Sequence, residues 1–171
     1  MSTSPALAVK ALEEALDIES DLQNELAAVL NSEQQLLTTM SLEELPQLHV
    51  QKEAVLARLG EQAKNLKACI KGLAQVIKLP ESESQSFSAI TGCLNDRDRS
   101  RLRKAQQDLI SLTGKVRDQN RINDRLIHGS MSYVSQYLTL LRGLVAQPAG
   151  YLSSGIVTER QQSGRILALR G

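Results

Sequence analysis

The stretch NRINDRLIHGSMSYVSQYLTLL, residues 120–141, contains the features that decide the fold. Its apolar residues recur at steps of three and four, which is the spacing of an amphipathic α-helix. Asn120 and Asn123 fall where the apolar stripe would otherwise continue, and a strongly apolar segment follows them. Amides in a helical seam and a wide apolar face both need a neighbouring helix, so the stretch predicts packing of helix against helix.

The composition predicts an all-α protein. The 171 residues include no Trp, one Phe and three Tyr, so aliphatic side chains must form the core. Leu, Ala, Gln, Glu, Lys and Arg lose little on entering a helix, whereas the β-branched and aromatic residues typical of strands are scarce. The length suits one domain of ordinary size.

Three long stripes with helical spacing run along the chain. They predict helices at residues 5–38, 46–78 and 96–146, connected up, down and up. We expect these helices to form an antiparallel, coiled-coil-like bundle over residues 1–147, followed by a flexible C-terminal tail at 148–171.

A short turn is expected before the second helix. Ser41 followed by Glu44 is a capping-box pattern, in which each side chain would bind a free backbone N–H group. Pro46 cannot donate a backbone hydrogen bond, so the chain is expected to turn briefly before the helix proper begins.

The segment LPESESQSFS, residues 79–88, is the clearest break in the sequence, because its proline and serines offer the backbone alternatives to a helix. A short helical turn around Phe87, Ile90 and Leu94 is expected to cover the open end of the core. Asn95 is a favourable N-cap for the third helix.

The charge distribution disfavours nucleic acid as a partner. The net charge is +1, and basic residues alternate with acidic ones over most of the chain. DRDRSRLRK at residues 96–104 is a local exception, but no aromatic residue lies there to stack on a base. Two interpretations remain for this basic segment, a solvated helix start and a docking patch for an acidic partner.

No metal or cofactor site is predicted. Cys69 and Cys93 lack the close spacing of zinc ligands, and His49 and His128 have no Glu or Cys at a repeating ligand offset. Both cysteines are therefore expected to be small buried hydrophobic residues in a reducing compartment. The glycine-rich loop that would hold a phosphate is also missing from the sequence.

The sequence predicts a soluble, cytoplasmic protein. Its first twenty residues lack the basic region of a signal peptide and reach Glu13 and Glu14 before an apolar run develops. The apolar run LAAVL at residues 26–30 is too short to span a bilayer.

The third helix is longer than its neighbours require. About 50 residues extend roughly 75 Å, against roughly 50 Å for each of the first two helices. An antiparallel third helix would draw level with the start of the second near Ile127 and His128, so residues after Gly129 are expected to overhang. The overhang is apolar, with Met131, Tyr133, Val134, Tyr137, Leu138, Leu140, Leu141, Leu144 and Val145.

Two explanations for this apolar overhang stay open. It could be covered by the protein itself, through a break at Gly129 or exchange with a second copy in a homodimer. A partner chain could instead dock on it as helix against helix. For Asn120 and Asn123, we expect a role in fixing helix alignment, so replacing both by Leu should preserve or raise thermal stability while loosening the register.

Several motifs together resemble the FlgN family of flagellar export chaperones. NRINDRLI carries two Asn three residues apart before an apolar pair, and GYLSSG and SGRILALRG follow the third helix. Upstream, LLTTMSLEELPQLHVQKEAVLARL is similar to the family's first connection and second helix. The family motif corresponds here to Asn120, Asn123, Leu126, Ile127, Tyr151 and Gly155. Leu152 departs from it, because the family often has an acidic residue after the tyrosine.

The resemblance implies a cytoplasmic helical protein without enzymatic activity. Such proteins bind the hook-filament junction proteins before export and deliver them to the gate of the flagellar type III secretion apparatus. The client would be the C-terminal helical region of a junction protein. The residues expected to bind it are Met131, Tyr133, Val134, Tyr137, Leu138, Leu141, Leu144, Tyr151 and Ile156.

Two other classes of function remain. A coiled-coil scaffold or adaptor with no export role would share every periodic feature but would not need the tail. An enzyme is disfavoured, because no group of acids, bases or nucleophiles converges in the sequence, and each Asp or Glu is explained as helix surface or as a cap.

Overall fold

The computed structural model describes residues 4–145, with side chains as far as Arg142. This part of the chain is helical and contains no strand, which confirms the all-α prediction. Its elements are α1 (Pro5–Thr39), the 3-10 helix η1 (Leu42–Glu44), α2 (Leu45–Val76), α3 (Phe87–Gly92) and α4 (Asp96–Val145). The ends of the three long helices lie within two residues of the ranges expected from the sequence.

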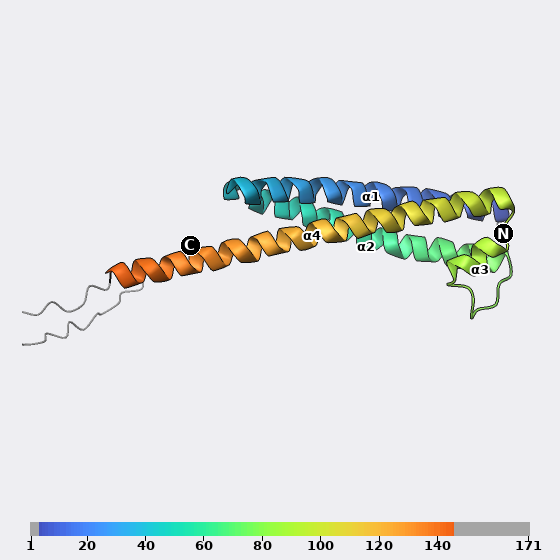
Figure 1. Cartoon of the computed structure of the whole chain (residues 1–171). Coiled ribbons are helices and arrows are strands. Elements are labelled where there is room, and N and C mark those ends of the chain that lie inside the picture. Colours follow the sequence, from blue (N-terminus) through green and yellow to red (C-terminus); the bar gives the residue numbers. More distant parts are fainter. Residues whose placement is uncertain (1–3, 146–171) are drawn as a thin grey trace, which may run out of the picture. The chain divides into compact units, whose positions relative to one another are not determined.

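The chain divides between His128 and Gly129 into two units. Unit 1 contains α1, η1, α2, α3 and the part of α4 before Gly129, and unit 2 begins at Gly129 within the same helix. In unit 1, α1 and α2 lie side by side in opposite directions, and the first part of α4 runs along them (Figure 1).

Two apolar clusters hold the helices of unit 1 together. The first joins the start of α1 to the end of α2, the short helix α3 and the start of α4. Its buried members are Ala8, Val9, Leu12, Leu16, Leu73, Ala74, Ile90, Leu94 and Leu102. The second lies further along α1 and contains Leu22, Leu26, Leu30, Val55, Leu59 and Val116. Because the first cluster joins the starts of α1 and α4 to the end of α2, α1 and α4 run parallel and α2 is antiparallel to both.

The connection between α1 and α2 turns through a left-handed residue. Met40 has a φ of 57°, and the N–H of Ser41 donates to the carbonyl of Leu36 at 3.0 Å, which closes the end of α1. The expected short turn is present as η1, with Pro46 in the first turn of α2. The prediction of a capping box was wrong, because the Ser41 side chain makes no capping hydrogen bond. Its Oγ instead accepts a hydrogen bond from Thr39 at 3.2 Å.

The end of α2 is a Schellman motif built on a lysine. Lys78 has a φ of 58°, in the left-handed region that favours glycine. The N–H of Leu79 donates to the carbonyl of Ala74 at 3.0 Å, and the N–H of Lys78 to that of Gln75 at 3.1 Å. Leu79 also packs against the first apolar cluster, which adds the hydrophobic contact of this motif.

The short helix expected after the break is α3, and it covers the end of the first cluster as predicted. Ile90 is fully buried, and Leu94 is buried just beyond the helix. Ser86 caps its start by accepting from the N–H of Ala89 at 3.3 Å. Asn95 caps α4 as expected, since its Oδ1 accepts from the N–H of Asp98 at 2.9 Å.

The basic segment at residues 96–104 was interpreted as a solvated helix start or as a docking patch for an acidic partner. Neither interpretation accounts for Arg99 and Arg101, which bind other parts of the protein. The guanidinium of Arg99 donates to the carbonyls of Thr91, Gly92 and Leu94 at 3.1, 3.1 and 2.8 Å. Arg101 forms an ion pair with Glu13 of α1 at 2.9 Å. These contacts fasten the C-terminal end of α3 and the start of α1 to α4, because carbonyls at a helix end lack partners in their own helix.

Candidate functional site

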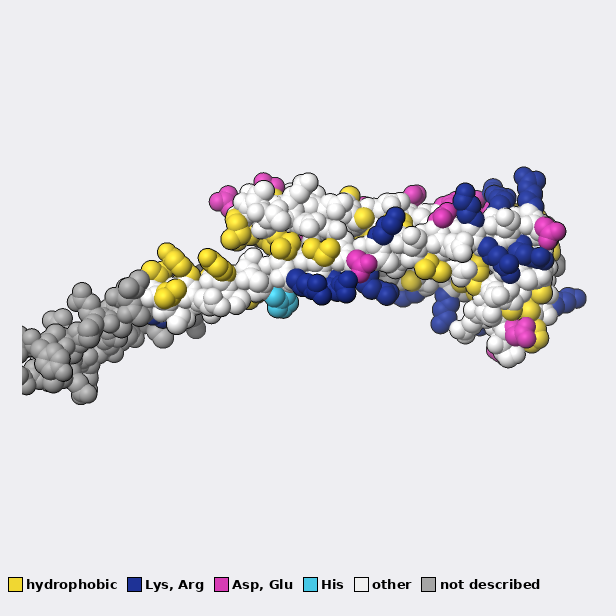
Figure 2. Space-filling model, viewed as in Figure 1, with side chains coloured by type: hydrophobic (Ala, Val, Ile, Leu, Met, Phe, Trp, Pro, Cys, Tyr) yellow, Lys and Arg dark blue, Asp and Glu magenta, His cyan; other side chains and the backbone are white. Residues whose placement is uncertain are grey.

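Unit 2 carries a row of exposed apolar side chains, called here the α4 apolar face. It consists of Met131, Tyr133, Val134, Tyr137, Leu138, Leu140 and Leu141. The exposed fractions of these seven residues lie between 39% and 74%. These fractions are high for large hydrophobic residues that lie close together on a single helix. Figure 2 shows hydrophobic side chains gathered on this part of α4.

The α4 apolar face is continuous around the helix. At about 100° per residue, its seven side chains occupy about half of the helix circumference. The other half carries only polar residues or glycine, which are Ser132, Ser135, Gln136, Thr139, Arg142 and Gly143. On this polar half, the Thr139 hydroxyl donates to the backbone carbonyl of Ser135 at 2.9 Å. Unit 2 therefore contains an amphipathic helix whose apolar half is wide.

Most of the α4 apolar face also lacks charge at its margins. The sequence from Gly129 to Leu141 contains no Asp, Glu, Lys or Arg, and Arg142 is the first charged residue after His128. Ion pairs at the edges of a helical seam normally select a partner by charge. Between Gly129 and Leu141, the face therefore has no charged residue that could form such an ion pair.

Covering the α4 apolar face would be favourable in free energy, because it would remove large apolar side chains from water. Burying one Leu, Val, Met or Phe side chain contributes about 1.5–3 kcal/mol, and contiguous exposed apolar patches mark contact sites. Seven of the expected client-binding and overhang residues are thus exposed and neighbouring. The Leu144 side chain, Tyr151, Gly155 and Ile156 lie outside the described residues.

The amides of the motif have different surroundings. Asn123 is fully buried, and its Nδ2 donates to the carbonyl of Leu30 and to the Glu33 carboxylate, both at 2.8 Å. Asn120 is half-buried, and its Nδ2 donates within α4 to Asp124 at 3.3 Å. Of these two motif amides, it is therefore Asn123 for which the described structure gives a hydrogen bond to a neighbouring helix.

Asn123 belongs to a polar junction of three helices, made by Glu33 of α1, Lys52 of α2 and Asn123 of α4. Lys52 Nζ lies 3.1 and 3.0 Å from the two carboxylate oxygens of Glu33. Both charged side chains are largely buried, so their pairing satisfies charges that would be costly to leave alone. Gln119 and Gln34 are joined by a further hydrogen bond between α4 and α1.

Sequence reasoning missed Glu33 and Lys52. A signal existed for Glu33, because it follows Leu26 and Leu30 at helical spacing and so falls inside the apolar stripe of α1. No comparable signal pointed to Lys52. Leu126 and Ile127 of the motif are half-buried, beside the junction in sequence.

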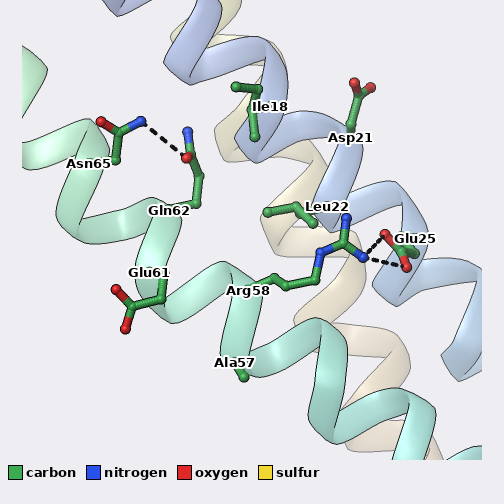
Figure 3. A pocket seen from close by; sticks show the side chains of 9 residues that line it. All are labelled: Ile18, Asp21, Leu22, Glu25, Ala57, Arg58, Glu61, Gln62 and Asn65. Carbon is green, nitrogen blue, oxygen red and sulfur yellow. Dashed lines mark hydrogen bonds and ion pairs between the residues drawn. The ribbon is translucent and has the colours of Figure 1, made fainter.

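Unit 1 also contains a groove between α1 and α2. Figure 3 shows its lining, which includes Ile18 and Leu22 on α1 and Gln62 on α2. The exposed ion pair of Arg58 with Glu25, with both distances 2.8 Å, crosses one end of it. The groove is open, two of its charged side chains form the Arg58–Glu25 pair, and Gln62 donates to the carbonyl of Ala15 at 2.7 Å, so we assign it no chemistry.

Cysteine chemistry does not mark a site in the described chain. Cys69 is half-buried against the first apolar cluster, and burial raises the pKa of its thiol. The prediction that Cys93 is buried was wrong, because this residue is exposed. Cys93 follows α3, where Ile90 and Leu94 take the interior positions instead.

Residues 4–145 contain neither a cluster of metal ligands nor a membrane-spanning helix. No group of three or more His, Cys, Asp or Glu side chains there is placed to hold a metal ion. No helix in the same range is both long and apolar enough to cross a membrane.

Comparison with known proteins decides the family. A family model described as FlgN protein matches residues 1–158, which is most of the chain. The chain belongs to the FlgN family. FlgN proteins are flagellar export chaperones, so this chain is a chaperone of flagellar protein export. No curated protein and no solved structure matches it.

Proposed function

We propose that this FlgN-family protein binds the C-terminal helical regions of hook-filament junction proteins in the cytoplasm. It keeps them unassembled and delivers them to the flagellar type III secretion gate. The observation that carries the proposal is the α4 apolar face, a wide, uncharged half of a helix in a chaperone of flagellar export. A chaperone for helices that later pack in a filament needs such a surface.

The polar junction supports assigning bundle stability and client binding to different parts of the chain. In unit 1, buried charges and amides hold α1, α2 and α4 together through partners on all three helices. In unit 2, by contrast, the α4 apolar face carries no charged group, and its hydrogen-bonding side-chain groups are the hydroxyls of Tyr133 and Tyr137. We therefore assign client binding to the α4 apolar face and bundle stability to the junction.

The C-terminal tail is part of the proposed client site. It contains Tyr151, Ile156 and Val157 and a second apolar group at Ile166, Leu167 and Leu169. These residues are too few to form a core alone, but they could pack beside a client helix that already lies on α4. The ordering cost would lower the affinity and so favour release at the gate.

The test is binding of a junction-protein C-terminal helix to the wild-type chain and to Tyr137→Asp by calorimetric titration. Tyr137 is exposed, so a charge there should weaken binding at least tenfold without unfolding α4. Gln136→Asp places the same charge on the adjacent polar half and should bind like wild type. Absence of binding by the wild type would reject the junction protein as client.

A coiled-coil scaffold remains the alternative function. It would use the α4 apolar face to hold a permanent partner or a second copy of this chain in a homodimer. Purification from cells followed by mass spectrometry separates the two. A junction protein at one-to-one stoichiometry supports the chaperone, whereas a stable homodimer with no export substrate supports the scaffold.

A further inference from the structure

The α4 apolar face is made of two parallel seams. Met131, Val134, Leu138 and Leu141 follow one another at steps of three, four and three. Tyr133, Tyr137 and Leu140 form a second series at steps of four and three. Alternating steps of three and four define the seam along which one helix packs on another. In the sequence, Val145 continues the first seam and Leu144 the second, each by a step of four.

The two seams point in different directions. At about 100° per residue, their centres lie about 110° apart around the α4 axis. One helix packed at the usual distance of 8–10 Å covers one seam and leaves most of the other in water. Two helices at that distance and angle would have axes about 15 Å apart, which exceeds the helix diameter of about 10–12 Å. Both can therefore be bound together.

The area available also favours two helices. Seven side chains of roughly 100 Å² each provide roughly 700 Å², near the about 800 Å² that each partner contributes to a stable interface. A single seam offers only about half of that. A single docked helix, whether from a client or from a second copy, would therefore leave about half of the face in water.

The chain's own tail fits neither seam well. A helix that matched a seam would need at least three uninterrupted turns with apolar residues at steps of three and four. Pro148, Gly150, Gly155 and Gly164 interrupt the tail sequence, and these residues disfavour a helix of that length. The tail can add contacts to a bound helix, but its sequence is unsuited to replacing one.

We infer that the α4 apolar face binds two amphipathic helices of one client at once, one on each seam. The partner has two helices with uncharged apolar stripes, because neither seam has a charged residue at its margin before Arg142. This inference rests on the proposed function, in which the client is a junction protein. It adds that a single client helix occupies only half of the site.

The test uses one exposed residue from each seam, Leu138 and Leu140, and a control on the polar half. The full chain and its variants Leu138→Asp, Leu140→Asp and Gln136→Asp are titrated with two probes. The first probe is a junction-protein C-terminal helix as a peptide. The second is a fragment of the same protein that joins its two terminal helical segments. Native mass spectrometry gives the stoichiometry, and circular dichroism checks that each variant keeps its helix.

Two peptides are expected per wild-type chain, and one per chain for each seam variant. The two-helix fragment should bind one to one, more tightly than the peptide, and lose at least tenfold in affinity in either seam variant. Gln136→Asp should match wild type throughout.

Other outcomes overturn the inference in distinguishable ways. One peptide per chain, with sensitivity to only one seam variant, would reject the second seam and leave the proposed function intact. The free chain could instead form a homodimer that Leu138→Asp or Leu140→Asp abolishes. If this homodimer persists when client is added, the seam that carries the substituted residue binds a second copy of the chain. Failure of both probes to bind wild type would reject the proposed function as well.

Discussion

Asn123 and Asn120 lie on the same helix, one turn apart, but their amides have different partners. Asn123 reaches Leu30 and the buried carboxylate of Glu33, whereas Asn120 reaches only Asp124 of its own helix. The sequence alone led us to expect that Leu at both positions would preserve stability. The buried partners of Asn123 reverse that expectation for this residue, because Leu cannot donate a hydrogen bond to Glu33.

Replacing Asn123 by Leu should therefore lower the free energy of unfolding by about 1–3 kcal/mol, the usual cost of leaving a buried polar group without a partner. Asn120→Leu is the matched control and should change it by less than about 0.5 kcal/mol, as at a partly exposed site. Urea unfolding of both variants measures the difference. Equal stability of Asn123→Leu and wild type would show that this amide fixes alignment without contributing to stability.

The two cysteines should differ in reactivity. Cys93 is exposed, whereas Cys69 is half-buried and burial raises the pKa of its thiol, which lowers the thiolate fraction at neutral pH. A thiol reagent added to the native protein should therefore modify Cys93 well before Cys69. Peptide mapping after brief labelling tests this, with Cys93→Ser expected to remove the fast phase. Labelling of Cys69 first would mean that α2 and its surroundings open readily.

At the scale of helices, the end of α2 stores a small strain. Lys78 adopts the left-handed conformation, which costs a side chain with a β-carbon about 1 kcal/mol more than glycine. Lys78→Gly should raise the free energy of unfolding by about 0.5 kcal/mol, once the greater freedom of glycine in the unfolded chain is included. Lys67→Gly makes the same change inside α2 and should lower it by about 1 kcal/mol. Thermal melts of both variants give the comparison, and a loss of stability in Lys78→Gly would contradict the strain.

The long helices could be predicted from sequence because each carries a repeated apolar stripe, and the ends could be placed because Pro46, Pro80 and Asn95 act locally. Contacts between distant residues were harder to predict. The role of Arg99 at the end of α3 and the pairing of Glu33 with Lys52 depend on how helices meet, not on local pattern. For the candidate site, the periodicity was enough to identify the α4 apolar face, since every residue there belongs to one helix.

Across the whole molecule, the distribution of charged residues changes along α4 at Gly129. Before Gly129 the helix carries Arg, Lys and Asp, and its buried side is tied to α1 through Asn123. From Gly129 to Leu141 it carries no charged residue, and its large apolar side chains are exposed. Stability and proposed client binding can thus be changed independently, because they depend on different residues of one helix.

Truncation after Gln147 tests that independence together with the role of the tail. All the buried residues of the two apolar clusters precede this point, so the melting temperature should change by less than about 2 °C. Affinity for a junction-protein helical fragment should fall, because Tyr151 and Ile156 can no longer pack beside the bound helix. Calorimetric titration and thermal melts of the truncated chain, with Leu141→Asp alongside, measure the two effects separately. Unchanged affinity in the truncated chain would remove the tail from the client site, and loss of the fold in Leu141→Asp would show that the α4 apolar face belongs to the protein's own core.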